Sequence, residues 1–266
     1  MFQYSNASHL KESNVYWRTT PESQACSRTM RRFVLGALAA LFACSFSPAW
    51  AEETSKPTRR LDEASLRPLM TEGVQAVKAR KPADAVKIFN EIDQKFRDAY
   101  ANGPRVYCSR GPKETVLYLT KSTAERGSAI AIGPLWCDAI YLKAYSLTEL
   151  GRPADAAKEL DRVLMIAPNN SQYLNERAHL LTQARDFTAA LAMFKQSEQD
   201  SALTPDPKVA NEMKSKACRG IGYALTEMGK FDESEANYMR CLTIDPNDQK
   251  SKKELAYIAQ LRARKK

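Results

Sequence analysis

The sequence predicts an all-α fold, in which helical hairpins repeat and stack into a solenoid with one irregular repeat and a C-terminal capping helix. Three observations predict it. Similar segments recur at a spacing of 34 residues, small residues stand where two helices of a hairpin must approach, and Gly or Pro stands where each helix must end. The 266 residues are 44% hydrophobic and 27% charged, which is typical of a soluble globular protein.

The N-terminal region predicts an export signal. Residues 1–29 read as ordinary polar sequence, so we expect a mis-assigned extension upstream of a true start at Met30. Residues 30–51 then have the layout of a signal peptide, with two arginines, a short apolar run and the small-x-small sequence that ends at Ala51. The apolar run is shorter than the roughly 20 residues that a membrane span needs. We therefore predict cleavage after Ala51 and a periplasmic location, with no integral membrane span.

A second interpretation of the same region stays open. Residues 41–44 resemble a bacterial lipoprotein cleavage box, which would anchor the protein through a lipid on Cys44. Phe42 is bulky at a position where such boxes have a small residue, so cleavage after Ala51 is the favoured prediction. Residues 52–65 are expected to form a polar lead-in to the repeats.

The repeats are visible as four similar segments. Ala156 and Ala190 are equivalent positions 34 residues apart, and Ser234 follows Ala190 after 44 residues. The extra ten residues predict a linker around Ser201–Lys208, which contains two prolines. Ala85 precedes Ala156 by 71 residues, which is two periods plus three, so one irregular unit lies between them.

This pattern resembles the tetratricopeptide repeat (TPR) family. In the unit 137–170 the family positions 8, 15, 20, 24 and 32 carry Ala144, Gly151, Ala156, Leu160 and Pro168. Matching units are 66–96, 171–204 and 215–248. The resemblance implies that the two helices of each unit pack closely and that each unit covers an apolar face of its neighbour.

Two segments depart from the repeat. In 97–136 the pair Gly103-Pro104 interrupts a first helix, and Pro112 opens a second helix that we expect to run to Ile132. We interpret this segment as a degenerate repeat with a lengthened second helix. Residues 249–266 carry apolar residues at helical spacing followed by a basic tail, which predicts the capping helix.

Four cysteines follow the predicted cleavage site: Cys108, Cys137, Cys218 and Cys241. No two of them are spaced as C-x-x-C, which argues against a zinc site or a thioredoxin-type motif. In an oxidising compartment they are candidates for the disulfides Cys108–Cys137 and Cys218–Cys241. Free buried cysteines are the alternative, because Cys packs well as a small apolar residue.

The net charge of +9 does not predict a nucleic-acid partner. The basic residues alternate with acidic ones along the repeats, and no nucleic-acid recognition motif accompanies them. His179 is the only histidine after residue 51, and no nucleophile stands beside it in a recognised arrangement. We therefore predict no catalytic residue, no metal, no cofactor and no enzymatic activity.

The resemblance also implies a binding surface. In TPR proteins, positions 2, 5, 9 and 12 of each first helix line a concave groove. Carried over to this chain, the candidate partner-binding residues are Tyr141, Tyr145, Asn175, His179, Arg219 and Tyr223. Asn175 is expected to hold a peptide backbone and Arg219 a carboxylate. For Tyr141 and Tyr145, packing between helices is the alternative.

The function implied by the resemblance is that of an adaptor or scaffold that binds a protein or peptide in this groove within the bacterial cell envelope. Two alternatives remain open. One is a structural subunit that assembles through the convex face or the capping helix, and the other is an accessory subunit of an envelope complex. The sequence identifies neither the partner nor the oligomeric state.

Overall fold

The computed structural model describes residues 61–263. The predicted signal peptide, the two candidate cleavage sites, Cys44 and the last residues of the basic tail therefore lie outside the described residues. Within 61–263, no helix combines the length and the apolar character that crossing a membrane requires.

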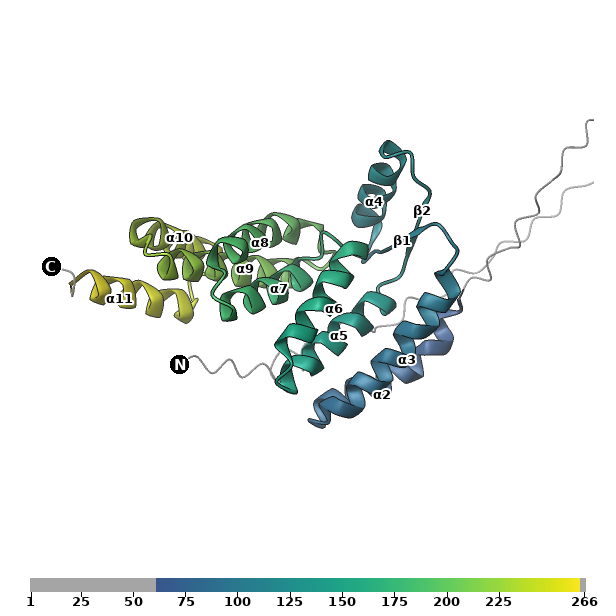
Figure 1. The fold of residues 1–266 in the computed structure, drawn as a ribbon. Coiled ribbons are helices and arrows are strands. Elements are labelled where there is room, and N and C mark those ends of the chain that lie inside the picture. The colour runs from purple at the N-terminus through teal and green to yellow at the C-terminus, as the bar shows by residue number, and fades with distance from the viewer. Residues whose placement is uncertain (1–60, 264–266) are drawn as a thin grey trace, which may run out of the picture. The chain divides into compact units, whose positions relative to one another are not determined.

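The described chain is a succession of antiparallel helical hairpins (Figure 1). Its elements in order are η3 (Glu63–Leu66), α2 (Arg67–Lys78), α3 (Pro82–Tyr100), β1 (Arg105–Cys108), α4 (Pro112–Ala124), β2 (Ala129–Ile132), α5 (Leu135–Glu149), α6 (Pro153–Ile166), α7 (Ser171–Gln183), α8 (Phe187–Asp200), η4 (Ser201–Leu203), α9 (Pro207–Glu227), α10 (Phe231–Ile244) and α11 (Gln249–Ala263). Apart from α4, consecutive helices pack on each other, and α3 packs directly on α5. The predicted helical solenoid is confirmed.

The first and last hairpins close where a glycine of the first helix faces an aromatic ring of the second. A Cβ atom at Gly73 would lie 2.5 Å from the ring of Phe89, and one at Gly222 would lie 2.6 Å from the ring of Tyr238. Both rings are buried. No side chain fits in these contacts without displacing an aromatic ring, so the small residues at position 8 fix the separation of the two helices.

The turn after each first helix requires a left-handed residue. Gly151 has φ +72° and Gly229 has φ +74°, and the equivalent positions after α2 and α7 are Arg80 (φ 56°) and Arg185 (φ 63°). At each turn the next amide bonds back to the helix, as Arg152 N–H does to the carbonyl of Leu147 at 2.9 Å. The family's glycine is therefore replaced by a conformationally strained arginine in two of the four hairpins.

The irregular segment is not a degenerate helical hairpin, so that prediction was wrong. It folds as a strand, a helix and a strand, and its two strands pair in parallel, with Val106 opposite Ile130 and Cys108 opposite Ile132. The helix α4 ends at Ala124, well before Ile132, because the following turn places Arg126 at φ 55°. The β-branched and small residues of β2 then continue as a strand. We call residues 105–132 the βαβ insert.

The ten-residue linker before the last repeat is also different from the prediction. After η4 only a short turn remains, and α9 begins at Pro207 and runs for 21 residues. Asp206 caps it by accepting hydrogen bonds from the amides of Lys208 and Val209. The extra residues therefore lengthen the first helix of the last repeat. The helix α11 covers that repeat, and its Ile258 is buried against Tyr238 and Cys241.

A buried carboxylate joins the first hairpin to the second. Asp93 of α3 is 1% exposed. It accepts hydrogen bonds from the indole of Trp136 at 2.8 Å and from both terminal nitrogens of Arg162, at 2.8 and 2.9 Å. Burial alone would raise the pKa of Asp93, but these partners hold it below its usual value.

Both cysteine pairs are disulfides in the structure. Cys108–Cys137 joins β1 to the first turn of α5, with a Cα–Cα distance of 6.2 Å. Cys218–Cys241 joins α9 to α10 within the last hairpin, with a Cα–Cα distance of 5.8 Å. Their sequence separations are 29 and 23 residues.

We expect Gly151→Ala to lower the free energy of unfolding by about 1–2 kcal/mol, the cost of a left-handed backbone with a Cβ atom. Nothing lies within 4 Å of the added Cβ, so backbone strain is the only cause. Denaturant unfolding measures the change. Gly103→Ala is the control, because its added Cβ also has room and its φ is not in the left-handed range. An equal loss in both variants would contradict the explanation.

We expect the double substitution Cys218→Ala and Cys241→Ala to lower the free energy of unfolding by about 3 kcal/mol, since the bond restricts a 23-residue loop of the unfolded chain. Thermal and denaturant unfolding of the oxidised parent and the variant measure this loss. An unchanged stability would mean that the bond does not constrain the unfolded chain.

Candidate interaction surface

The first helices of three consecutive hairpins carry the candidate binding residues. We define the first-helix face by Tyr141 and Tyr145 of α5, His179 of α7, and Arg219 and Tyr223 of α9. All five side chains are partly exposed. The repeat places them at equivalent positions, so the residues at position 9 read Tyr145, His179 and Tyr223 along the stack.

Tyr141 contacts the next hairpin. Its ring stacks on that of Tyr173 with a centroid distance of 5.2 Å, and the Tyr173 hydroxyl donates a hydrogen bond to Asp138 at 2.8 Å. Burial raises the pKa of Asp138 to about 6, while the Tyr173 hydroxyl and the charge of Arg110 act in the opposite direction. Tyr141 therefore packs between helices, which is the alternative to a binding role that the sequence left open.

Tyr145 lies further along the same helix. Burial raises the pKa of its hydroxyl, and the charges of Glu149 and Glu176 raise it further, while Arg80 lowers it. These charges come from α5, from α7 and from the turn after α2. Tyr145 is therefore within electrostatic range of charges from three successive hairpins and is partly exposed.

His179 is neutral over most of the pH range. Burial lowers the pKa of its imidazole to about 4, and the cations Lys216, Arg219 and Lys250 lower it further, against the opposing effect of Glu176. Its ring meets Phe194 edge to face at 5.2 Å. A neutral imidazole has one donor nitrogen and one acceptor nitrogen.

The charged groups around His179 form pairs between helices. Lys216 of α9 and Glu176 of α7 are 2.5 Å apart, and Arg219 of α9 is 3.1 Å from Asp248 at the start of α11. Burial alone would raise the pKa of Asp248, but the Ser251 hydroxyl and Arg219 lower it. The Arg219 guanidinium therefore already has a carboxylate partner within the chain.

Asn175 is not accessible to a partner, so its predicted role is corrected. It is 0% exposed, and its Nδ2 donates to the carbonyl of Met213 at 3.2 Å. Within residues 61–263 no donor reaches its Oδ1. The residue joins α7 to α9 below the surface, where a peptide backbone cannot contact it.

An open hollow lies away from the first-helix face. It is bounded by η3, by the end of α3 and by the βαβ insert, and its lining includes Leu61, Glu63, Tyr100, Arg110, Val116 and Ile132. The sequence did not predict it, because its lining includes Ala131 and Ile132 of β2, a strand that was expected to be part of a helix.

The last hairpin carries a recognisable family signature. The tetratricopeptide repeat profile matches residues 215–248, which is the span assigned to the last repeat from the sequence. A search among curated proteins found no match.

Solved structures share the fold over most of the chain. A Podospora anserina protein with nearly identical TPR-like repeats is 13% identical, with a TM-score of 0.51 over 76% of this chain and 88% of its own. The protein MamA from Desulfovibrio magneticus is 14% identical, with a TM-score of 0.50 over 76% of this chain and 87% of its own. The profile match supports a tetratricopeptide repeat in the last hairpin. At such low identity the structural likeness concerns the fold.

Two residues near His179 were missed by the TPR positions used in the sequence analysis. Glu176 stands at position 6 of its repeat, which is outside the set 2, 5, 9 and 12. Lys250 stands on α11, which was treated only as a cap. Extending the 34-residue period past 248 would have placed Lys250 at position 2 of a further unit, on the same face as Lys216.

Asp138 and His179 should give opposite responses of stability to acid. The folded pKa of Asp138, about 6, exceeds its unfolded value of 3.8, so the folded state binds protons more tightly and acidification from pH 6 to 3.8 stabilises it. The folded pKa of His179, about 4, is below its unfolded value of 6.5, so acidification from pH 6.5 to 4 destabilises the fold.

We therefore expect Asp138→Asn to raise the free energy of unfolding above pH 6, by at most about 3 kcal/mol at 1.36 kcal/mol per pKa unit. His179→Gln should remove a loss of similar size that the parent suffers below pH 6.5. Urea unfolding of parent and variants across this range tests both. A pH profile that neither substitution alters would contradict the assignment.

Proposed function

We propose that this protein is a non-catalytic adaptor that binds a peptide or protein on the first-helix face. TPR proteins generally mediate protein–protein interaction, and the fold is typically a non-catalytic interaction module. The observation that carries the proposal is the row Tyr145, His179 and Tyr223, one residue from each of three consecutive first helices, all partly exposed.

The chemistry of this row suits a protein partner. Tyrosine and histidine offer an apolar ring for contact and a polar tip for hydrogen bonding, and such residues are enriched where partners are held. Neighbouring contacts restrict them: Tyr223 meets Phe187 edge to face at 6.4 Å, and His179 meets Phe194. Side chains that are already ordered lose less entropy on binding.

We further propose that the protein works in the bacterial cell envelope after export. The signal-like segment 30–51 supports this location. Two disulfides in one chain also support it, because disulfides persist in oxidising compartments and are rare in the cytosol.

A second candidate function is that of a self-assembling or accessory subunit. Its support is a group of exposed apolar side chains on second helices and on α11, which would be covered in an assembly: Met165, Met239 and Tyr257 are 63%, 57% and 47% exposed. The two functions use different surfaces and are separable by position.

We expect a photo-crosslinking amino acid at position 145 to capture one dominant partner in the native cell, identified by mass spectrometry. Tyr223→Ala in the same chain should reduce the adduct, since it truncates a hot-spot-type residue of the same row. Tyr257→Ala is the matched control and should leave the adduct unchanged.

Capture from position 165 or 257 but not from 145 would contradict binding on the first-helix face and favour the structural subunit. An adduct from 145 that Tyr223→Ala leaves unchanged would show that the row does not act as one surface.

A further inference from the structure

The βαβ insert contacts parts of the chain that are distant in sequence. Its Lys113 Nζ is 3.5 Å from the carbonyl of Ala202, and its Gly111 packs beside the ring of Pro205. The hydroxyl of its Tyr118 accepts the backbone N–H of Asn169 at 3.4 Å. The insert, which follows the first hairpin, therefore touches the turns before and after the α7–α8 hairpin.

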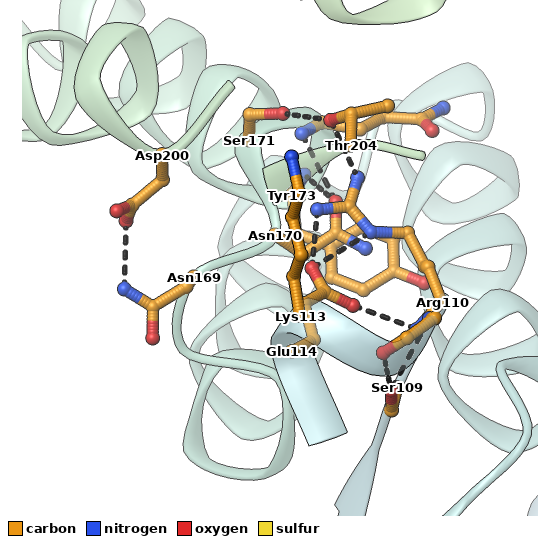
Figure 2. A network of polar contacts seen from close by, with 12 residues as sticks. Ser109, Arg110, Lys113, Glu114, Asn169, Asn170, Ser171, Tyr173, Asp200 and Thr204 are labelled. Atoms are coloured by element: carbon orange, nitrogen blue, oxygen red, sulfur yellow. Dashed lines mark hydrogen bonds and ion pairs between the residues drawn. The ribbon is translucent and has the colours of Figure 1, made fainter. Parts of the chain in front are cut away.

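Arg110 adds a further contact between the insert and the turn before α9 (Figure 2). Its side chain is 10% exposed and forms an ion pair with Glu114, which is 1% exposed. The Arg110 backbone N–H also donates to Glu114 at 2.7 Å, and the guanidinium donates to the Thr204 hydroxyl at 3.2 Å. An ion pair with so little access to water has a fixed geometry, and replacing one partner alone would leave a buried charge.

The turns that the insert contacts are themselves joined. Asn169 Nδ2 donates to Asp200 at 2.9 Å, and the hydroxyls of Ser171 and Thr204 are 3.4 Å apart (Figure 2). The Ser197 hydroxyl donates to the carbonyl of Ser171 at 2.8 Å. The α6–α7 and α8–α9 turns thus form one polar network, which the insert meets through Arg110 and Tyr118.

The same network reaches the first-helix face. The charge of Arg110 stabilises the carboxylate of Asp138, which holds the Tyr173 hydroxyl, and the Tyr173 ring packs on Tyr141. These interactions connect the insert to Asp138 of α5, then to Tyr173 of α7, and then to Tyr141 of the first-helix face.

A covalent bond holds the insert in this place. Cys108 ends β1 two residues before Arg110, and its disulfide partner Cys137 immediately precedes Asp138. The bond therefore ties the two charged members of the network together at the start of α5. The second disulfide, Cys218–Cys241, lies within the last hairpin and touches none of them.

We propose that the βαβ insert is a brace that sets the position of the α5–α6 hairpin against the α7–α8 hairpin, with Arg110 as its positioning residue. The insert is fixed to α5 by the Cys108–Cys137 disulfide and to the α8–α9 turn by Arg110 and Thr204. The spacing of Tyr141 and Tyr145 from His179 depends on it. The consequence for partner binding rests on the function proposed above, whereas the geometric statement does not.

Three variants weaken the brace in different ways. Thr204→Val removes one hydrogen bond and is the mildest. Arg110→Met combined with Glu114→Gln removes both buried charges, so that neither is left unpaired. After Glu114→Gln, the side chain at 114 still has an oxygen that can accept the backbone N–H of residue 110. Cys108→Ala with Cys137→Ala removes the bond. The matched control is Cys218→Ala with Cys241→Ala, which removes a comparable bond elsewhere.

The test measures the distance between two spin labels by pulsed electron resonance on the purified protein. Labels attached through keto amino acids replace the exposed residues Lys158 of α6 and Lys195 of α8, one on each of the two hairpins. This leaves the cysteines intact and places both labels outside the α9–α10 hairpin. We expect the three brace variants to shift or broaden the distance by about 1–2 Å or more, the size of ordinary helix shifts at an interface, and the control to match the parent.

Parental distances in all three brace variants, or an equal change in the control, would overturn the proposal. In chains with the photo-crosslinker at 145, the brace variants should also lower the adduct yield by about two-fold or more, the lower end of such coupling effects. Altered distances with an unchanged yield would overturn the link between brace and partner. If no adduct forms even in the parent, the binding function fails while the distance test still decides the brace.

Discussion

The structure depends on how closely the two helices of each hairpin approach. Gly73 and Gly222 meet aromatic rings at distances that leave no room for a Cβ atom, and Ala178 packs in the buried cluster that contains Phe194. This contact fixes the hairpin as a unit, and stacking then needs only the apolar faces that remain. Because every first helix has a small residue at this position, with Ala144 in α5, equivalent positions of successive first helices fall on one side of the stack. The row of residues at position 9 is a consequence of that constraint.

Within this frame, polar groups decide how particular hairpins meet. Asp93 joins the first hairpin to the second through Trp136 and Arg162. Arg110 and Glu114 have the equivalent role between the α5–α6 and α7–α8 hairpins. Apolar stacking alone tolerates small slides between hairpins, whereas a buried charge with fixed hydrogen-bond partners does not, because each lost partner leaves an unsatisfied group. The two networks therefore define positions that the repeat itself leaves loose.

The sequence predicted the parts of the fold that follow from local rules. Small residues, glycines and prolines at fixed spacing were enough for the hairpins, because each acts through its own backbone or its immediate contact. The βαβ insert was not predicted because strand pairing between residues 105–108 and 129–132 is non-local. The end of α4 at Ala124 does have a local signal in Gly127, three residues later. Asn175 was misplaced for a different reason: TPR positions give the helix face but not the depth, and here α9 covers the residue. The long α9, which begins eight residues before the repeat, is what provides that cover.

The charges around His179 limit what kind of recognition the first-helix face can use. Lys216 and Arg219 are already paired with Glu176 and Asp248, so an acidic partner would gain only the difference between its own contacts and those it displaces. Because these pairs are partly buried, replacing Glu176 or Asp248 by an acidic partner is still less favourable, since the displaced carboxylate must be rehydrated or paired again. For the partner proposed above, affinity on this face would then come mainly from the rings of Tyr145, His179 and Tyr223, and the charges would contribute selectivity by repelling a partner whose own charges are misplaced.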